Sequence, residues 1–248
     1  MKETLIDFDI TNLAAKECCC EIVDKLTSPK KNWLACLNPH SYAVALKDQQ
    51  FKIALDKADW LIPDGIGIVY ASRFLGGQLR KRVTGADVFF GVLDLLNQLG
   101  GAKVFFIGST ESTLSKIKDG MLRDFPNVNV VGVYSPPFKA DYNQVELSEM
   151  IDAINAAKPD VLWVGMTAPK QEKWIFENLP LLDIKFAAAI GAVFDFYAGN
   201  IQRANPLVQK LGLEWLIRFL REPVRLWRRY FISIPTFLWS VAKYRFRN

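Results

Sequence analysis

Cysteine and histidine are scarce in this sequence. Four cysteines occur in 248 residues, and three of them are consecutive, at positions 18 to 20. This spacing matches neither a disulfide framework nor the C-x-x-C pairs of zinc and redox sites, so it predicts a reducing compartment and buried packing for the adjacent thiols. The single histidine, His40, would have to serve alone in any Ser-His-Asp or Cys-His triad. We expect a capping or loop role for it rather than catalysis.

Long hydrophobic runs are also absent. The longest uncharged run near the C-terminus, Tyr230 to Ala242, is shorter than the roughly 20 residues that a membrane-spanning helix requires. Four of the first nine residues are charged, which does not fit a secretory leader. We therefore expect neither a spanning helix nor a secretion signal.

Several ligand-binding motifs are missing. The sequence contains neither the G-x-G-x-x-G fingerprint of dinucleotide binding nor the G-x-x-x-x-G-K-[ST] phosphate loop, and it has too few ligands for a zinc site. Asp7-Phe8-Asp9 forms a D-x-D, the pattern that many sugar transferases use for a divalent ion. It lies within an alternating segment, Leu5 to Ile10, that predicts an edge strand, so we interpret it as structural. We expect no metal and no cofactor.

Charge is distributed unevenly along a composition that is otherwise globular. Half of the residues are apolar and 23% are charged, which excludes a disordered or collagen-like chain. Residues 203–248 hold ten Lys or Arg and two Glu, a net +8, which leaves −3 for the rest of a chain whose total is +5. A basic C-terminal part on a slightly acidic body indicates an anionic partner.

The body predicts an α/β fold. Short apolar runs that end in Gly, Pro or Asn alternate with helical periodicity, as in a parallel sheet covered on both faces. We predict a Rossmann-like, mostly parallel sheet with helices on both faces over residues 1–205. The predicted strands are residues 33–37, 103–107, 128–133, 161–164 and 186–190, and the predicted helices are residues 14–26, 42–57, 67–75, 86–99, 110–125, 144–157 and 170–178.

Residues 206–248 form a separate, basic and aromatic-rich tail. The pattern predicts two or three amphipathic helices broken near Pro223 and Pro235, with arginines and aromatic rings beside an apolar face. Such a helix suits the surface of an anionic membrane; the alternative is an ordinary amphipathic helix packed on the body. Nucleic acid is not expected as a partner, because phosphate contact needs no thick apolar stripe. If the apolar helices do not meet lipid, they could pair in a homo-oligomer.

Polar motifs follow the predicted strands, where an open α/β sheet binds its ligands. Asn38 follows the first predicted strand, Pro63-Asp64-Gly65-Ile66-Gly67 closes an apolar stretch, and Gly108-Ser109-Thr110 starts a helix. Glycines at helix starts allow backbone N–H groups to approach a phosphate. Asp64 is the carboxylate that stands out: it could be a plain helix N-cap, or a general base that takes a proton from an attacking hydroxyl.

Taken in order, these motifs resemble the WecG/TagA/CpsF family of bacterial glycosyltransferases. The resemblance extends from about residue 5 to residue 229 and includes Arg82 to Asp87, Pro169 to Glu172 and Gly191 to Gly199. It implies an inverting, metal-independent enzyme at the cytoplasmic face of the bacterial inner membrane. Such an enzyme moves a sugar from a UDP-sugar donor to a polyprenyl-diphosphate-linked acceptor in surface polysaccharide or wall polymer synthesis. It leaves the donor sugar and the acceptor saccharide open.

The resemblance also implies roles for individual residues. Asp64 corresponds to the proposed general base, and the tail would close over the active site. One departure is Cys36, where many members have threonine. The substrate-binding residues that it implies are Asn38, Gly65, Gly67, Arg82, Gly85, Asp87, Gly108, Lys170, Gln171, Glu172, Gly191 and Asp195, and the residues for the lipid diphosphate are Arg218, Arg221 and Arg225.

Guanidinium groups can neutralise a diphosphate without a metal, which agrees with the absence of a D-x-D placed after a core strand. Two alternatives stay open from the sequence: a nucleotide-dependent Rossmann oxidoreductase and a non-catalytic adaptor at the membrane surface.

Overall fold

A computed structural model describes residues 1–201, 224, 227 and 229–247. Its centre is a six-stranded sheet in the order β4-β3-β8-β7-β5-β6, with all neighbouring strands parallel. The strands are β3 (Asn32–Leu37), β4 (Trp60–Pro63), β5 (Lys103–Gly108), β6 (Asn129–Tyr134), β7 (Val161–Gly165) and β8 (Phe186–Ala189). The predicted α/β fold with a parallel sheet is confirmed.

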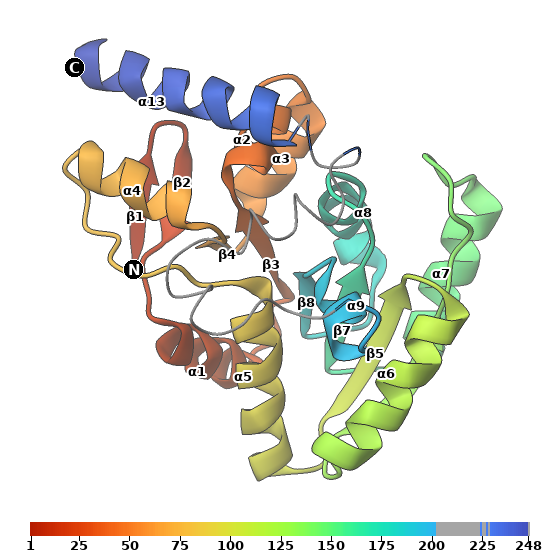
Figure 1. Cartoon of the computed structure of the whole chain (residues 1–248). Helices are drawn as coiled ribbons and strands as arrows, with labels where there is room; N and C mark the ends of the chain where they lie inside the picture. The colour runs from red at the N-terminus through yellow and green to blue at the C-terminus, as the bar shows by residue number, and fades with distance from the viewer. Residues whose placement is uncertain (202–223, 225–226, 228, 248) are drawn as a thin grey trace.

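Helices cover both faces of the sheet (Figure 1). Those described before residue 202 are α1 (Ala15–Lys25), α2 (Pro39–Ala45), α3 (Gln49–Lys57), α4 (Ile66–Phe74), α5 (Gly85–Leu99), α6 (Glu111–Asp124), α7 (Gln144–Ala157), α8 (Lys170–Asn178), the 3-10 turn η1 (Leu179–Leu181) and α9 (Val193–Tyr197). Helices α1, α5, α6 and α9 pack on one face, and α2, α3, α7 and α8 pack on the other.

The strands alternate between these two layers, as a sheet buried on both faces requires. In β7, Leu162 and Val164 contact one core cluster, while Val161 and Trp163 contact the other. All four side chains are fully buried. The adjacent cysteines belong to the second layer: Cys18 and Cys19 are buried in α1, as the sequence predicts, and Cys20 is half-buried.

The N-terminal segment differs from the prediction. Instead of an edge strand of the main sheet, β1 (Lys2–Leu5) and β2 (Phe8–Thr11) form a separate antiparallel hairpin. Ile6, with φ of 57°, turns the chain between them, and no Gly or Asn in the sequence signals this turn. The Thr11 side chain accepts a hydrogen bond from the Leu61 amide, which ties the hairpin to β4.

Two further boundaries differ. The predicted helix over residues 42–57 is two helices, because Asp48 caps α3 by accepting a hydrogen bond from the Phe51 amide at 3.0 Å. The strand β4 was not predicted. It ends in Pro63, which is tolerated because β4 is at the edge of the sheet.

The C-terminal helix α13 (Ile234–Arg247) lies across α2 at one end of the molecule (Figure 1). It follows directly on a π-helical turn, η2 (Arg229–Ser233), so the predicted break near Pro235 is a change of helix type. Phe237 and Val241 are buried, and the ring of Phe237 meets the ring of Tyr42 at 5.2 Å between centroids. The predicted break near Pro223 lies outside the described residues.

None of the helices in the described part of the chain is both long enough and apolar enough to cross a bilayer.

Candidate active site

The carboxyl ends of the parallel strands bring the predicted motifs to one edge of the sheet. Strands β4, β3, β8 and β7 are consecutive neighbours. Asp64 directly follows β4, and Asn38 directly follows β3. Gly191 is the second residue after β8, and Gln171 lies in α8, the helix that follows β7. Residues far apart in the sequence therefore converge where open α/β sheets bind ligands.

A crevice for a ligand is expected between β5 and β7. The chain leaves β5 toward β6 on one side and leaves β7 toward β8 on the other, and such diverging connections open a crevice beyond the strand ends. Gly108 and Gly165 pair there. A side chain at Gly108 is excluded, because its Cβ would lie 2.5 Å from the Gly165 carbonyl oxygen and its φ is +115°.

Asp64 is held by the end of the neighbouring strand. Its amide donates a hydrogen bond to the carbonyl of Leu37 at 2.8 Å, which continues the β3–β4 pairing one residue beyond β4. The N-cap of α4 is Gly65, which has no side chain to cap the helix, so Asp64 stands one residue before the N-cap position. Its side chain is half-buried.

The two glycines after Asp64 allow α4 to approach α2. Gly65 has φ of +152°, and a Cβ on Gly67 would lie 2.9 Å from Cγ of Pro39. Asn38 stands at this contact. Its side-chain oxygen accepts hydrogen bonds from the amides of His40 and Ser41, both at 3.0 Å, so it caps α2.

A backbone hydrogen bond brings the segment of Arg82 to the end of β4. The amide of Val83 donates to the carbonyl of Pro63 at 3.2 Å, so the segment that starts α5 runs along the end of β4. Arg82 is half-buried there. This arrangement places a guanidinium group and a carboxylate on neighbouring segments of the same edge.

The start of α5 packs on the floor of the site. A Cβ on Gly85 would lie 3.4 Å from Sγ of Cys36 and 3.5 Å from Cγ2 of Ile190. Burial raises the pKa of the Cys36 thiol well above its usual value, and the negative charges of Asp64 and Glu172 raise it further. Cys36 therefore lies near both carboxylates, on β3 between them.

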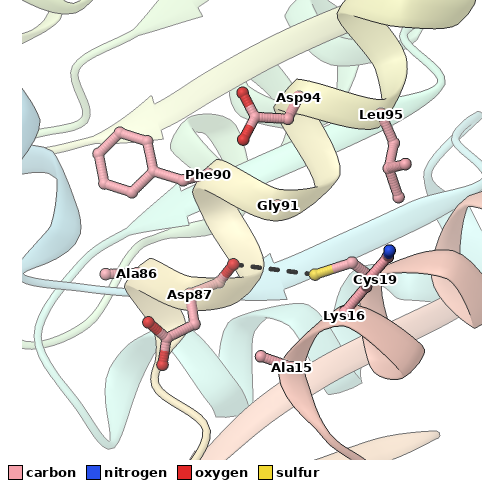
Figure 2. A pocket seen from close by; sticks show the side chains of 9 residues that line it. All are labelled: Ala15, Lys16, Cys19, Ala86, Asp87, Phe90, Gly91, Asp94 and Leu95. Atoms are coloured by element: carbon pink, nitrogen blue, oxygen red, sulfur yellow. Dashed lines mark hydrogen bonds between the residues drawn. The ribbon is translucent and has the colours of Figure 1, made fainter.

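Asp87 lies at the start of α5, beside α1. Its carboxylate accepts a hydrogen bond from the Thr84 amide at 2.8 Å, and its amide donates to the Thr84 hydroxyl at 3.1 Å, a capping box that starts α5. Figure 2 shows it beside Lys16 and Cys19 of α1, in a groove between α1 and α5. Its described contacts connect it to the helix start rather than to Asp64.

Gln171 and Glu172 form a buried pair in the first turn of α8. Nε2 of Gln171 donates to Oε1 of Glu172 at 2.9 Å. Burial raises the pKa of Glu172 to about 7. The amide of Gln171 lies against Gly191, whose added Cβ would be 3.4 Å from Gln171 Oε1. This pair therefore connects the loops that follow β7 and β8.

The described side-chain contacts of Lys170 and Asp195 are with residues outside the predicted motifs. The Lys170 ammonium donates to the Lys139 carbonyl at 2.5 Å and lies 3.6 Å from the centroid of the Tyr142 ring, and partial burial lowers its pKa. Asp195 lies in α9, with Oδ1 3.4 Å from Nδ2 of Asn200. The described contacts tie Lys170 to the segment before α7 and Asp195 to the residues that follow α9.

The tail reaches the same edge through His40. Nδ1 of His40 and the hydroxyl of Ser233 are 2.8 Å apart, and Ser233 is buried. The backbone amide of His40 donates a hydrogen bond to the side-chain oxygen of Asn38. The capping or loop role expected for His40 fits its described contacts. Arg218, Arg221 and Arg225 lie outside the described residues.

Sequence reasoning missed three parts of this site. Tyr142 and Ser233 have no motif around them, because their roles depend on contacts with residues 28 and 193 positions away. Cys36 opens the motif that leaves the first predicted strand, but its position against Gly85 was not predicted. Its position inside β3, two residues before Asn38, was the signal that it lies beneath the ligand edge.

Metal ligands do not cluster in the described ranges: no group of three or more His, Cys, Asp or Glu side chains could hold an ion there. Asp9, in the D-x-D segment, accepts a hydrogen bond from the Thr4 hydroxyl at 2.6 Å within the β1–β2 hairpin. This contact agrees with a structural role for the segment.

Together, the parallel sheet and the acid, amide and guanidinium groups at its carboxyl edge are the arrangement expected of an α/β enzyme that binds its ligand at that edge. The chain belongs to the glycosyl transferase WecG/TagA/CpsF family, which it matches over residues 3–248. The resemblance carried by the motifs is thereby confirmed, and the chain is a glycosyltransferase. The oxidoreductase and the adaptor alternatives are set aside.

Curated relatives agree with this assignment. A protein of Bacillus spizizenii is 32% identical over 219 residues, which cover 88% of this chain and 82% of the relative. A protein of Bacillus subtilis is 30% identical over 210 residues, covering 85% and 78%, and one of Staphylococcus aureus is 28% identical over 206 residues, covering 83% and 78%. Each is named N-acetylglucosaminyldiphosphoundecaprenol N-acetyl-beta-D-mannosaminyltransferase.

Proposed function

We propose that this enzyme transfers a sugar, with inversion and without a metal, from a UDP-sugar to a saccharide linked to polyprenyl diphosphate. By similarity to the named relatives, the sugar is N-acetylmannosamine and the acceptor is N-acetylglucosaminyl-diphospho-polyprenol. The observation that carries the proposal is the position of Asp64, whose backbone is fixed at the end of β3, beside the segment of Arg82.

The proposed reaction is a single displacement. The names of the relatives specify a β-linked product, and formation of a β-linkage from an α-linked UDP-sugar requires inversion at the anomeric carbon. Asp64 takes the proton of the acceptor hydroxyl as its oxygen forms the new bond to that carbon, and the bond to the UDP oxygen breaks. UDP leaves as an anion.

Arginines would stabilise this leaving group. A guanidinium group forms bidentate hydrogen bonds with phosphate oxygens and keeps its charge at every relevant pH. Arg82 belongs to the described site, and Arg218, Arg221 and Arg225 are proposed to come from the tail and to hold a diphosphate. The proposed tail, residues 206–248, would then complete the active site, since Ser233 contacts His40 beside Asn38.

The tail is also proposed to bind the anionic surface of the cytoplasmic membrane. The inner side of α13 packs on the body through Phe237 and Val241, while Leu238 and Trp239 are 58% and 73% exposed. Exposed aromatic and aliphatic side chains followed by Lys243, Arg245 and Arg247 suit the headgroup boundary of a bilayer. The inner side of α13 packs on the body as an ordinary amphipathic helix does, and its outer side is the one proposed to bind the membrane.

A substrate screen tests the proposed function. Purified enzyme is incubated with radiolabelled UDP-N-acetylmannosamine and other UDP-sugars, a short-chain prenyl-diphospho-N-acetylglucosamine, and either EDTA or MgCl₂. We expect label in the lipid product with UDP-N-acetylmannosamine and an equal rate in EDTA. Product that forms only with added metal would overturn the metal-free scheme, and no product with any UDP-sugar would overturn the proposed reaction.

A further inference from the structure

The buried side chains of Gln171 and Glu172 have more hydrogen-bonding atoms than their described contacts satisfy. Gln171 is 5% exposed and Glu172 is 2% exposed, in a helix turn that follows the central strand β7. Their mutual hydrogen bond uses Gln171 Nε2 and Glu172 Oε1. Within the described part of the chain, Gln171 Oε1 and Glu172 Oε2 have no hydrogen-bond partner.

Such atoms are costly in a folded protein. A buried acceptor without a donor destabilises the native state by about 1–3 kcal/mol, so native proteins place ligands or bound water at most of them. Two such oxygens on adjacent side chains, at the ligand edge of a parallel sheet, indicate a place where a donor group from a substrate completes the hydrogen bonding.

The surroundings of Gln171 Oε1 point to the active site. The side-chain amide lies against Gly191, where the missing side chain leaves the oxygen 3.4 Å from the ideal Cβ position, and the carbonyl of Met166 lies at the same distance from that position. Glu172 is near enough to Cys36 to raise its pKa, as Asp64 also is. The pair therefore belongs to the same edge as the proposed general base.

Glu172 determines which way the Gln171 amide faces. A carboxylate oxygen only accepts hydrogen bonds, so it selects the NH₂ group of the amide. Once Nε2 is directed to Glu172, Oε1 is the remaining polar atom of the amide, and the ideal Cβ position of Gly191 lies 3.4 Å from Oε1 and 3.5 Å from Nε2. Without a carboxylate partner, the two ends of the amide could exchange places.

We propose that Glu172 is a positioning residue that orients the Gln171 carboxamide so that Oε1 accepts a hydrogen bond from an O–H or N–H group of the sugar being transferred. This inference rests on the proposed sugar transfer. An N-acetylhexosamine offers both kinds of donor, in its hydroxyls and its acetamido N–H. A nucleotide sugar that lacks the matching donor group would leave Oε1 buried and unpaired, which disfavours its use.

A double-mutant cycle tests this assignment. We expect Glu172→Gln to lower kcat/KM for the UDP-sugar by about 10-fold and Gln171→Ala by about 10- to 100-fold, as for a lost hydrogen bond. Because Glu172 acts through Gln171, the double variant should be no slower than Gln171→Ala alone. Multiplied losses in the double variant would mean that Glu172 has an independent, structural effect and would overturn the proposal.

The pH profile provides a second readout. With the pKa of Glu172 raised to about 7, kcat/KM of the wild type should change through neutral pH, and Glu172→Gln should lose that change. Glu177→Gln is the matched control, because it removes the charge of an exposed Glu on the same helix. An identical pH profile in wild type and Glu172→Gln would contradict the role of Glu172.

The inference remains testable if the proposed reaction fails. The side-chain NH₂ resonances of Gln171, identified by their loss in Gln171→Ala, should shift with pH near 7 in the wild type and not in Glu172→Gln. If no UDP-sugar is transferred but these resonances titrate, the proposed function is wrong and the orientation of the amide by Glu172 stands. Resonances that do not respond to pH in the wild type would overturn the orientation itself.

Discussion

At the scale of single residues, the site combines side chains with different tasks. Asn38 and Asp87 use their side chains to cap α2 and α5, so part of their role is to hold helix starts against the ligand edge. Asp64 stands one residue before the N-cap of α4, which is Gly65. Its place therefore differs from that of Asp87, whose carboxylate accepts a hydrogen bond from the amide of the α5 N-cap residue Thr84.

Cys36 should be unreactive in the folded protein. Burial and the neighbouring charges of Asp64 and Glu172 raise the pKa of its thiol well above 9, so it is protonated at pH 8. Brief alkylation with iodoacetamide at pH 8, followed by peptide mass spectrometry, should leave Cys36 unmodified in the native enzyme and modify it fully in guanidinium chloride. Equal modification in both conditions would contradict the raised pKa of this half-buried thiol.

Motifs in the sequence indicated which residues lie at the ligand edge, but they did not indicate which side chains these residues contact. Asp64, Gly85 and Gly191 stand in motifs that directly follow or precede regular elements, and the strand order then brings them together. The Lys170–Tyr142 contact and the His40–Ser233 contact join segments whose separation in sequence carries no local signal. Such pairs arise only from tertiary packing.

At the scale of elements, local chemistry explains which predictions succeeded. Helices α7 and α8 have the predicted bounds because Asn143 caps one and Pro169 precedes the other. Strand β4 was missed because it has four residues and ends in proline, which weakens a strand pattern. The split of residues 42–57 depends on Asp48, whose capping bond to Phe51 competes with a continuous helix.

The attachment of α13 to the body depends on its inner face. Phe237 is 1% exposed and contacts Tyr42, so Phe237→Ala should destabilise the packing of α13 by about 3–5 kcal/mol, as for other buried aromatic truncations. Amide hydrogen exchange should become faster throughout α13. The neighbouring Leu238→Ala is the control, because Leu238 is exposed, and it should leave exchange unchanged. Slow exchange in both variants would show that this contact does not hold the helix.

At the scale of the whole molecule, we propose that the sheet and the tail serve one reaction, with the tail at the membrane surface. The carboxyl edge of the sheet holds the groups proposed for the reaction, and α13 lies at one end of the molecule (Figure 1). Its side chains Leu238 and Trp239 are exposed. A lipid-linked acceptor remains in the membrane, so an enzyme that binds the membrane surface meets its substrate at a higher local concentration.

The outer face of α13 should govern binding to vesicles. Trp239→Ala removes a ring that is 73% exposed, so we expect weaker co-sedimentation with vesicles that contain phosphatidylglycerol and no change in melting temperature. Raising the salt concentration should also weaken binding, because the basic side chains act through screened charge. Ile53→Ala, on α3 of the body, is the matched apolar control. Equal loss with both variants would argue against α13 as the membrane contact.

The most direct test of the account is the transfer rate of Asp64→Asn with the lipid-linked acceptor. The substitution keeps the size of the side chain and removes its ability to take a proton, so kcat should fall by about 10²- to 10⁴-fold. Melting temperature and vesicle binding should stay at wild-type values, and Asp94→Asn, an exposed acid on α5, should transfer sugar at the wild-type rate. Wild-type transfer by Asp64→Asn would contradict the central claim that this carboxylate is the general base.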